Sequence, residues 1–255
     1  MNYKISDKVL LLTTHVPPDF HHAVGLFGCL VLLPLLEYHA AMFNPLSYKV
    51  SVLDFDGTVA DSMPTWGMAD KSILNRFGVV PDQAFMISLI PLSERECSRL
   101  FQEKGVKLGI EEIIQEKHAY MQRAYGTVVE LKPGVVRVLD YLKGGGQKLI
   151  IFSSTPSELI RISLRKNGIE GYFDDVISAS ERGLSKANVE SFRVFARAIG
   201  YEPEEIAFYD DNVRALRNAK AAGLAAIGVY DEYSAQTQEE IKSIVDCYVT
   251  DWASF

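Results

Sequence analysis

The sequence predicts an α/β protein: a Rossmann-like three-layer sandwich with a parallel sheet of about five strands and an inserted helical cap. Two observations carry this prediction. Short apolar runs rich in β-branched residues alternate with helical stretches, as they do in βαβ units. One region, residues 62–128, interrupts that alternation and carries helical patterns alone.

Each expected strand is a short apolar run followed by polar or turn residues. These runs are 49–55, 148–152, 175–179, 206–209 and 225–230. Asn167, Gly200 and Gly223 each directly follow a helical stretch, and Asn or Gly is typical just past a helix C-terminus. The expected helices of this part are 156–166, 187–199, 213–222 and 235–245.

The interrupting region contains three helical patterns, each closed by glycine. They cover residues 65–77, 93–104 and 110–125. Ser93 and Glu96 fit a capping box at the start of the second pattern. Because parallel sheets bind ligands at the carboxyl ends of their strands, an insert that leaves the first strand there is expected to lie over the site.

The N-terminal region differs from the rest of the chain. Its apolar run, 23–36, is broken by Pro34 and is shorter than the roughly 20 residues of a bilayer span. It also lacks the basic start and cleavage site of a signal peptide. Three interpretations stay open: a loosely packed appendage, a membrane-associating segment, or upstream sequence that the native protein lacks, with Met42 as its start. The expected parts are an N-terminal extension (1–45), a core domain (46–60 and 129–255) and a cap domain (61–128).

The composition is that of an acidic globular protein, with 48% hydrophobic residues and a net charge of -7. An acidic protein gathers polyphosphate backbones poorly, so nucleic acid is not an expected partner, and a membrane is not expected either. Cys29, Cys97 and Cys247 are scattered and odd in number. This pattern disfavours a disulfide framework or a zinc site and favours the reducing cytoplasm.

Asp54 and Asp56 form the sharpest feature, in the segment DFDGT at the end of the first expected strand. Side chains two residues apart on a strand share a side, so the two carboxylates are expected close together. Such a pair suits Mg²⁺, and one carboxylate can attack phosphorus while the other transfers the leaving-group proton. Gly57 permits a sharp turn, and the Thr58 backbone N–H can face a phosphate oxygen. The alternative is an Asp-Gly turn that merely closes a strand.

Three more features are expected at the same edge of the sheet. Ser153 and Ser154 end the second strand, where a hydroxyl can donate to a phosphate oxygen. Lys186 precedes a later helix, and Asp210 and Asp211 end the fourth strand. Each feature alone has an ordinary explanation as a surface residue, turn or cap. Their order along the chain is what favours phosphoryl transfer.

This order resembles the layout of the haloacid dehalogenase (HAD) superfamily. The resemblance covers about residues 47–250 and is carried by segments such as DFDGTVADSMPTW and KLIIFSSTPSELI. It is closest to the subgroup with a helical cap, which includes β-phosphoglucomutase-like phosphatases. The resemblance implies a magnesium-dependent phosphatase of a small phosphorylated metabolite that works through an aspartyl-phosphate.

The resemblance also implies residue roles. Asp54 would be the nucleophile, and Asp56 the general acid and then the general base. The phosphate-binding residues would be Thr58, Ser153, Ser154 and Lys186. The metal would be held by Asp54, Asp56 through its backbone carbonyl, Asp210 and Asp211.

Two departures from the family pattern stand out. Lys186 is followed by Ala187 instead of proline, which leaves the backbone less restrained. Ala215 occupies a position where many relatives carry a second acidic residue, a loss that the pair Asp210 and Asp211 is expected to cover.

Alternative functions are disfavoured to different degrees. Asp56 argues against a dehalogenase, which lacks an acid at that position. A phosphosugar mutase shares the catalytic core, but Pro91 and Glu94 stand where its cap would need basic residues. The intact set of acidic residues gives no support to a non-catalytic or membrane-tethered binding protein. Trp66, Met68 and Arg95 lie in segments expected to face the cleft, but each is more simply interpreted as a core or surface residue. The substrate and the oligomeric state stay open.

Overall fold

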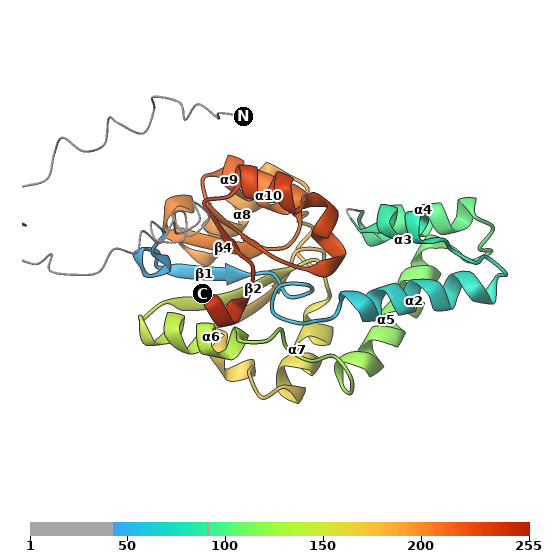
Figure 1. The fold of residues 1–255 in the computed structure, drawn as a ribbon, viewed down its shortest axis with the longest axis horizontal. Coiled ribbons are helices and arrows are strands. Elements are labelled where there is room, and N and C mark those ends of the chain that lie inside the picture. Colours follow the sequence, from blue (N-terminus) through green and yellow to red (C-terminus); the bar gives the residue numbers. More distant parts are fainter. Residues whose placement is uncertain (1–42, 91) are drawn as a thin grey trace, which may run out of the picture. The chain divides into compact units, whose positions relative to one another are not determined.

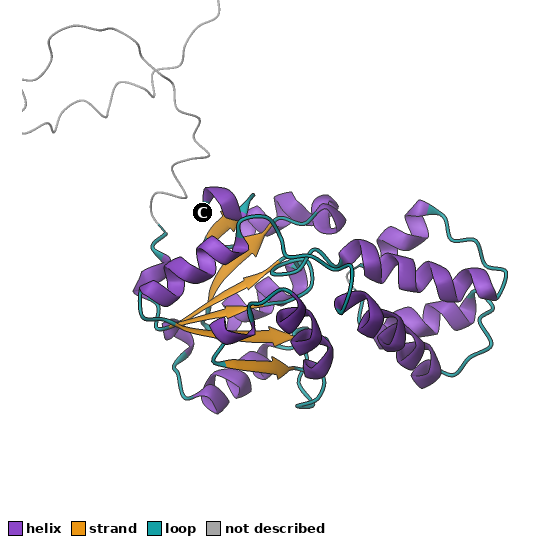
Figure 2. Ribbon diagram, turned by 90° about the horizontal axis from the view of Figure 1, so that it is seen from below, coloured by secondary structure: helices purple, strands orange, loops and turns teal. Residues whose placement is uncertain are grey.

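A parallel six-stranded sheet forms the centre of the protein, in the order β3-β2-β1-β4-β5-β6 (Figure 2). The computed structural model describes residues 43–90 and 92–255, which belong to one compact unit of the chain. The expectations for the apolar run 23–36 and for Met42 lie outside the described residues. The strands are β1 (Val50–Leu53), β2 (Lys148–Ser153), β3 (Asp175–Ser178), β4 (Ile206–Asp210), β5 (Ala225–Val229) and β6 (Cys247–Val249).

The sheet lies between two layers of helices, so the predicted three-layer α/β sandwich is confirmed (Figure 1). Side chains alternate between the faces: Leu53 packs toward α6 and α7, whereas Val50 and Val52 pack toward α8, α9 and α10. All four residues of β1 are buried, as expected of a central parallel strand. The covering helices are α6 (Val135–Gly144), α7 (Ser157–Lys166), α8 (Val189–Ile199), α9 (Val213–Ala222) and α10 (Gln238–Ile244).

Several local details differ from the sequence-based expectation. The sheet has a sixth strand, β6, and the core has a further helix, α6, which were not predicted. The three residues of β6 are too few to show a periodicity. Helix α8 starts at Val189 and not at 187, because the Asn188 side chain accepts a hydrogen bond from the Glu190 N–H and caps the helix. The expected helix 235–245 divides into a 3₁₀ helix, η5 (Glu232–Thr237), and α10.

The segment 61–128, called the cap segment below, contains helices alone among its named elements. Its helices enclose a hydrophobic cluster of their own, around Leu74, Phe101 and Ile113. This separate cluster supports the proposed division into core and cap. The capping box of Ser93 and Glu96 is present. The helices are α2 (Met63–Arg76), α3 (Gln83–Leu89, not predicted), α4 (Glu94–Glu103) and α5 (Ile110–Tyr125).

Among residues 43–90 and 92–255, no helix combines the length and apolar character needed to cross a bilayer.

Candidate active site

The turn that follows β1 carries the two aspartates of the DFDGT segment. Because β1 ends at Leu53, Asp54 and Asp56 lie beyond the strand, and the strand alternation used to pair them does not apply. Gly57 has a φ of 78°, in the region that favours glycine. A Cβ at this position would lie 2.8 Å from the carboxylate of Asp211, so glycine is required on steric grounds as well.

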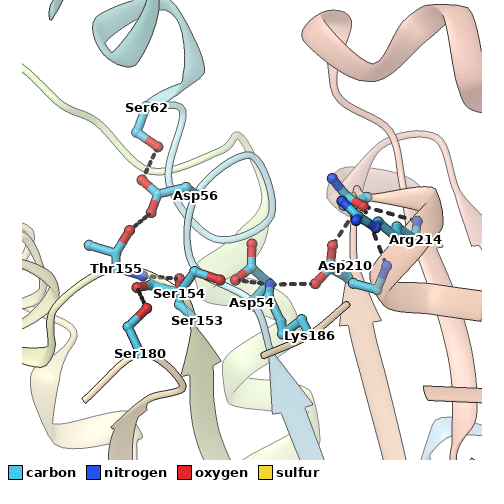
Figure 3. Close-up of polar contacts among 12 residues, drawn as sticks. Asp54, Asp56, Ser62, Ser153, Ser154, Thr155, Ser180, Lys186, Asp210 and Arg214 are labelled. Carbon is cyan, nitrogen blue, oxygen red and sulfur yellow. Dashed lines mark hydrogen bonds and ion pairs between the residues drawn. The ribbon is translucent and has the colours of Figure 1, made fainter. Parts of the chain in front are cut away.

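Lys186 connects two carboxylates that come from different strands. Its Nζ lies 2.6 Å from Asp54 Oδ1 and 2.7 Å from Asp210 Oδ2, and Figure 3 shows these three side chains in a row. Asp54 and Asp210 follow or end β1 and β4, which pair in parallel, and this places them at the same edge of the sheet. The Lys186 carbonyl accepts a hydrogen bond of 3.0 Å from the Asn218 side chain. Asn218 therefore restrains the lysine backbone in the absence of the family's proline.

Burial sets the electrostatics of this group. It raises the pKa of Asp54 to about 7; Lys186 opposes this effect, while the Asp210 and Asp56 carboxylates add to it. Burial, with Asp210 and Asp54 nearby, also raises the pKa of Asp211 well above its usual range. Burial disfavours the charge of Lys186, but Asp210 and Asp54 outweigh it and raise the pKa of the lysine. One cation thus faces three buried carboxylates.

The three carboxylates form a group that fits a divalent cation. Asp54, Asp210 and Asp211 each offer an oxygen within 4.8 Å of the others, and all three are buried. Hard cations prefer such oxygen ligands, and a second positive charge would balance the excess acid. The Asp56 side chain is not part of this group.

The predicted phosphate-binding residues do not all lie together. Ser153 is buried and Ser154 is exposed, and both line the cavity above Asp54. Thr58 is fully buried and is not among the residues that line this cavity. Its N–H donates to the Phe55 carbonyl at 3.4 Å, and its own carbonyl accepts a 2.8 Å hydrogen bond from the Trp252 indole. A phosphate-binding role stays a prediction for all of these residues.

The cavity has a volume of about 1530 Å³ and is lined by core and cap residues. Its cap side includes a lysine–carboxylate ion pair and a histidine–carboxylate contact. Lys117, which is almost completely buried, lies 2.8 Å from Asp70, and His118 lies 2.9 Å from Glu94. The cap side therefore offers hydrogen-bond donors and acceptors in about equal measure.

Asp56 lines the same cavity but makes different contacts. Its carboxylate accepts hydrogen bonds from Ser62, Trp66, Tyr125 and Thr155, not from Lys186. None of these four donors was among the predicted site residues. Ser62 and Thr155 lie close in sequence to predicted residues, whereas Trp66 and Tyr125 carry no motif that marks them.

Comparison with known proteins agrees with this layout. Residues 51–229 match the model of the family described as haloacid dehalogenase-like hydrolase. The chain is 23% identical over 177 residues to the phosphorylated carbohydrates phosphatase of Thermotoga maritima, covering 69% of this chain and 82% of that one. It is 24% identical over 185 residues to the fructose-1-phosphate phosphatase YqaB of Escherichia coli K12, covering 71% and 96%.

A solved structure shares the fold. The crystal structure of CbbY from Rhodobacter sphaeroides in complex with phosphate matches with a TM-score of 0.71 at 21% identity, covering 81% of this chain and 95% of that one. The family model spans more than half of the sequence and contains the residues that meet at the edge of the sheet. This chain belongs to the haloacid dehalogenase-like hydrolase family.

Proposed function

We propose that this protein is a magnesium-dependent phosphatase of a small phosphorylated metabolite and that Asp54 is its nucleophile. The observation that carries the proposal is the buried group of Asp54, Lys186, Asp210 and Asp211 at the floor of a cavity. The two relatives named above are phosphatases of phosphorylated small molecules, and their names support the same activity here.

The proposed reaction has two steps, and each uses these side chains. An Asp54 oxygen attacks phosphorus, the bond from phosphorus to the leaving oxygen breaks, and Asp56 gives that oxygen a proton. Asp56 then takes a proton from water as the water oxygen attacks phosphorus. The bond from phosphorus to the Asp54 oxygen breaks, which regenerates the Asp54 carboxylate and releases inorganic phosphate. Lys186 stabilises the charge on the transferring group. Mg²⁺ held by Asp54, Asp210, Asp211 and the Asp56 carbonyl would supply charge neutralisation for the phosphoryl oxygens.

Hydrolysis is favoured over a mutase reaction by the charges of the cap. A mutase needs free cations there to hold a second phosphate. Two cavity-lining cations of the cap are engaged in ion pairs, Lys117 with Asp70 and Arg95 with Glu111, whereas Lys71 and Arg99 also line the cavity. Incubation with glucose 1-phosphate and a bisphosphate primer separates the two reactions, because a phosphatase releases phosphate and a mutase yields glucose 6-phosphate.

The mixed donors and acceptors of the cap side favour a substrate rich in hydroxyl groups, such as a phosphorylated carbohydrate. Lys117 and His118 can donate to hydroxyl oxygens, and Asp70 and Glu94 can accept from hydroxyl protons. A panel of phosphorylated sugars, polyols and carboxylates would identify the substrate. The buried free thiols of Cys97 and Cys247 accord with the proposed cytoplasmic location.

Phosphate release is expected to depend on Mg²⁺. The purified protein should hydrolyse p-nitrophenyl phosphate with Mg²⁺ present, lose the activity in EDTA, and regain it when excess Mg²⁺ is added. Colorimetric measurement of p-nitrophenol and phosphate checks this. Undiminished activity in EDTA would refute the metal dependence.

Binding of Mg²⁺ is also expected to stabilise the fold more at pH 8 than at pH 5. The raised pKa of Asp54, about 7 against roughly 4 in the unfolded chain, means that the ion-free folded state retains a proton in this interval. Rising pH therefore destabilises the ion-free fold, whereas Mg²⁺ binds the ionised carboxylates. Thermal melts with and without Mg²⁺ measure the difference. Asp211→Asn, which removes a ligand, is the control and should show a smaller shift; an equal shift at both pH values contradicts the prediction.

A further inference from the structure

The two oxygens of the Asp56 carboxylate have unequal surroundings. Oδ1 accepts hydrogen bonds from Ser62 Oγ at 2.5 Å, from Trp66 Nε1 at 3.0 Å and from the Tyr125 hydroxyl. Oδ2 accepts one hydrogen bond, of 2.7 Å, from Thr155 Oγ1. Figure 3 shows Ser62 and Thr155 on opposite sides of this carboxylate.

This asymmetry determines which oxygen can exchange a proton. A carboxylate oxygen has about two lone-pair sites, so three donors saturate Oδ1. A proton on Oδ1 would face three donors and displace at least one of them. Oδ2 has one lone-pair site left, and Asp56 lines the cavity.

All three donors on Oδ1 come from the cap segment, and two of them, Trp66 and Tyr125, lie in its helices. Trp66 lies in the first turn of α2, and Tyr125 is the last residue of α5, so they flank the points where the chain leaves and re-enters the core. Trp66 Nε1 also lies 3.1 Å from the Tyr125 hydroxyl. Tyr125 is fully buried, and its ring packs edge-on against Phe55, with 5.7 Å between centroids. The pair therefore has little freedom to move away from Asp56.

We propose that Trp66 and Tyr125 are positioning residues that hold Oδ1 of Asp56, so that Oδ2 is the oxygen that transfers the proton. The proposal rests on the proposed phosphatase function. In the first step Oδ2 releases its proton to the leaving oxygen as the bond to phosphorus breaks. In the second step Oδ2 accepts a proton from the attacking water. Loss of the Tyr125 hydroxyl removes one of the three hydrogen bonds that hold Oδ1, leaves the carboxylate less restrained, and reduces the fraction of enzyme with a correctly placed proton.

The dependence of the rate on the leaving group tests this role. An alkyl alkoxide is a strong base and needs a proton as it departs, whereas p-nitrophenolate is a weak base and needs little help. If Asp56 is no longer held in position, the hydrolysis of alkyl phosphates should therefore slow more than the hydrolysis of aryl phosphates. A general loss of structure would slow both substrates by the same factor.

The experiment compares kcat/KM for glycerol 1-phosphate and p-nitrophenyl phosphate in the wild type, Tyr125→Phe, Trp66→Phe and Tyr120→Phe. Tyr120→Phe is the matched control, because Tyr120 lies on the same helix and makes none of the hydrogen bonds to Asp56. Tyr125→Phe is expected to lose roughly tenfold or more with the alkyl phosphate and less than about threefold with the aryl phosphate. Trp66→Phe should show the same pattern, and Tyr120→Phe should match the wild type.

The outcomes separate this inference from the proposed function. Equal losses for both substrates in Tyr125→Phe and Trp66→Phe, or no loss for either, overturn the positioning role while the phosphatase stands. A wild type that hydrolyses neither substrate overturns both. If Tyr125→Phe does not fold, as judged by circular dichroism, the leaving-group pattern of Trp66→Phe decides.

Discussion

Asp54→Asn is expected to lower phosphate release by roughly 10⁴-fold or more, since the loss of a nucleophile removes the covalent route. An amide oxygen is a poor nucleophile, and the variant also removes the charge that contacts Lys186 Nζ at 2.6 Å. Steady-state hydrolysis of p-nitrophenyl phosphate measures the effect. Asp140→Asn is the matched control. Asp140 lies on α6 and accepts a surface hydrogen bond from the Tyr172 hydroxyl, so the activity of this variant should equal that of the wild type.

The covalent step can be observed directly as well. Acid-quenched wild-type enzyme should carry a phosphoryl group on the peptide that contains Asp54, detectable by mass spectrometry, and Asp54→Asn should carry none. A phosphorylated peptide elsewhere in the chain, or full activity of the variant, would refute the role of Asp54.

Lys186→Met is expected to reduce both activity and stability. Methionine keeps most of the side-chain volume but leaves Asp54, Asp210 and Asp211 without their lysine partner at a buried site. Breaking a buried ion pair costs about 3–5 kcal/mol, and loss of the phosphoryl-stabilising cation should lower kcat/KM by roughly 10²- to 10³-fold.

Urea unfolding and kinetics, each with and without Mg²⁺, measure these effects. Mg²⁺ can balance the negative charge of the carboxylates that Lys186→Met leaves without their lysine partner. It should therefore restore more of the stability than of the activity, which also needs the lysine. Lys143→Met is the control, because the Lys143–Asp174 pair is partly exposed and such pairs contribute about 0–1 kcal/mol. Equal destabilisation by the two substitutions would contradict the buried ion-pair account.

Local sequence signals predicted most of the fold. The helices α5 and α9 have the bounds expected from their periodicity and from the glycines that follow them. Likewise, Asp54, Ser153 and Asp210 could be expected at one place, because each lies at the carboxyl end of a strand in a parallel sheet. Regular elements carry a repeating signal within a few residues, and topology then places their ends.

The hydrogen bonds that hold Asp56 and the turn after β1 had no comparable signal in the sequence. Tyr125 and Asp56 are separated by 69 positions in sequence, and Trp252 and Thr58, whose hydrogen bond supports the turn after β1, by 194. The sequence alone therefore determined five of the six strands, most of the helices that cover them and the carboxylates at the edge of the sheet. Only the tertiary structure decided that Lys186 joins Asp54 to Asp210 and that the cap segment holds Asp56. Those pairings depend on how whole elements pack, and packing brings together side chains that no local pattern connects.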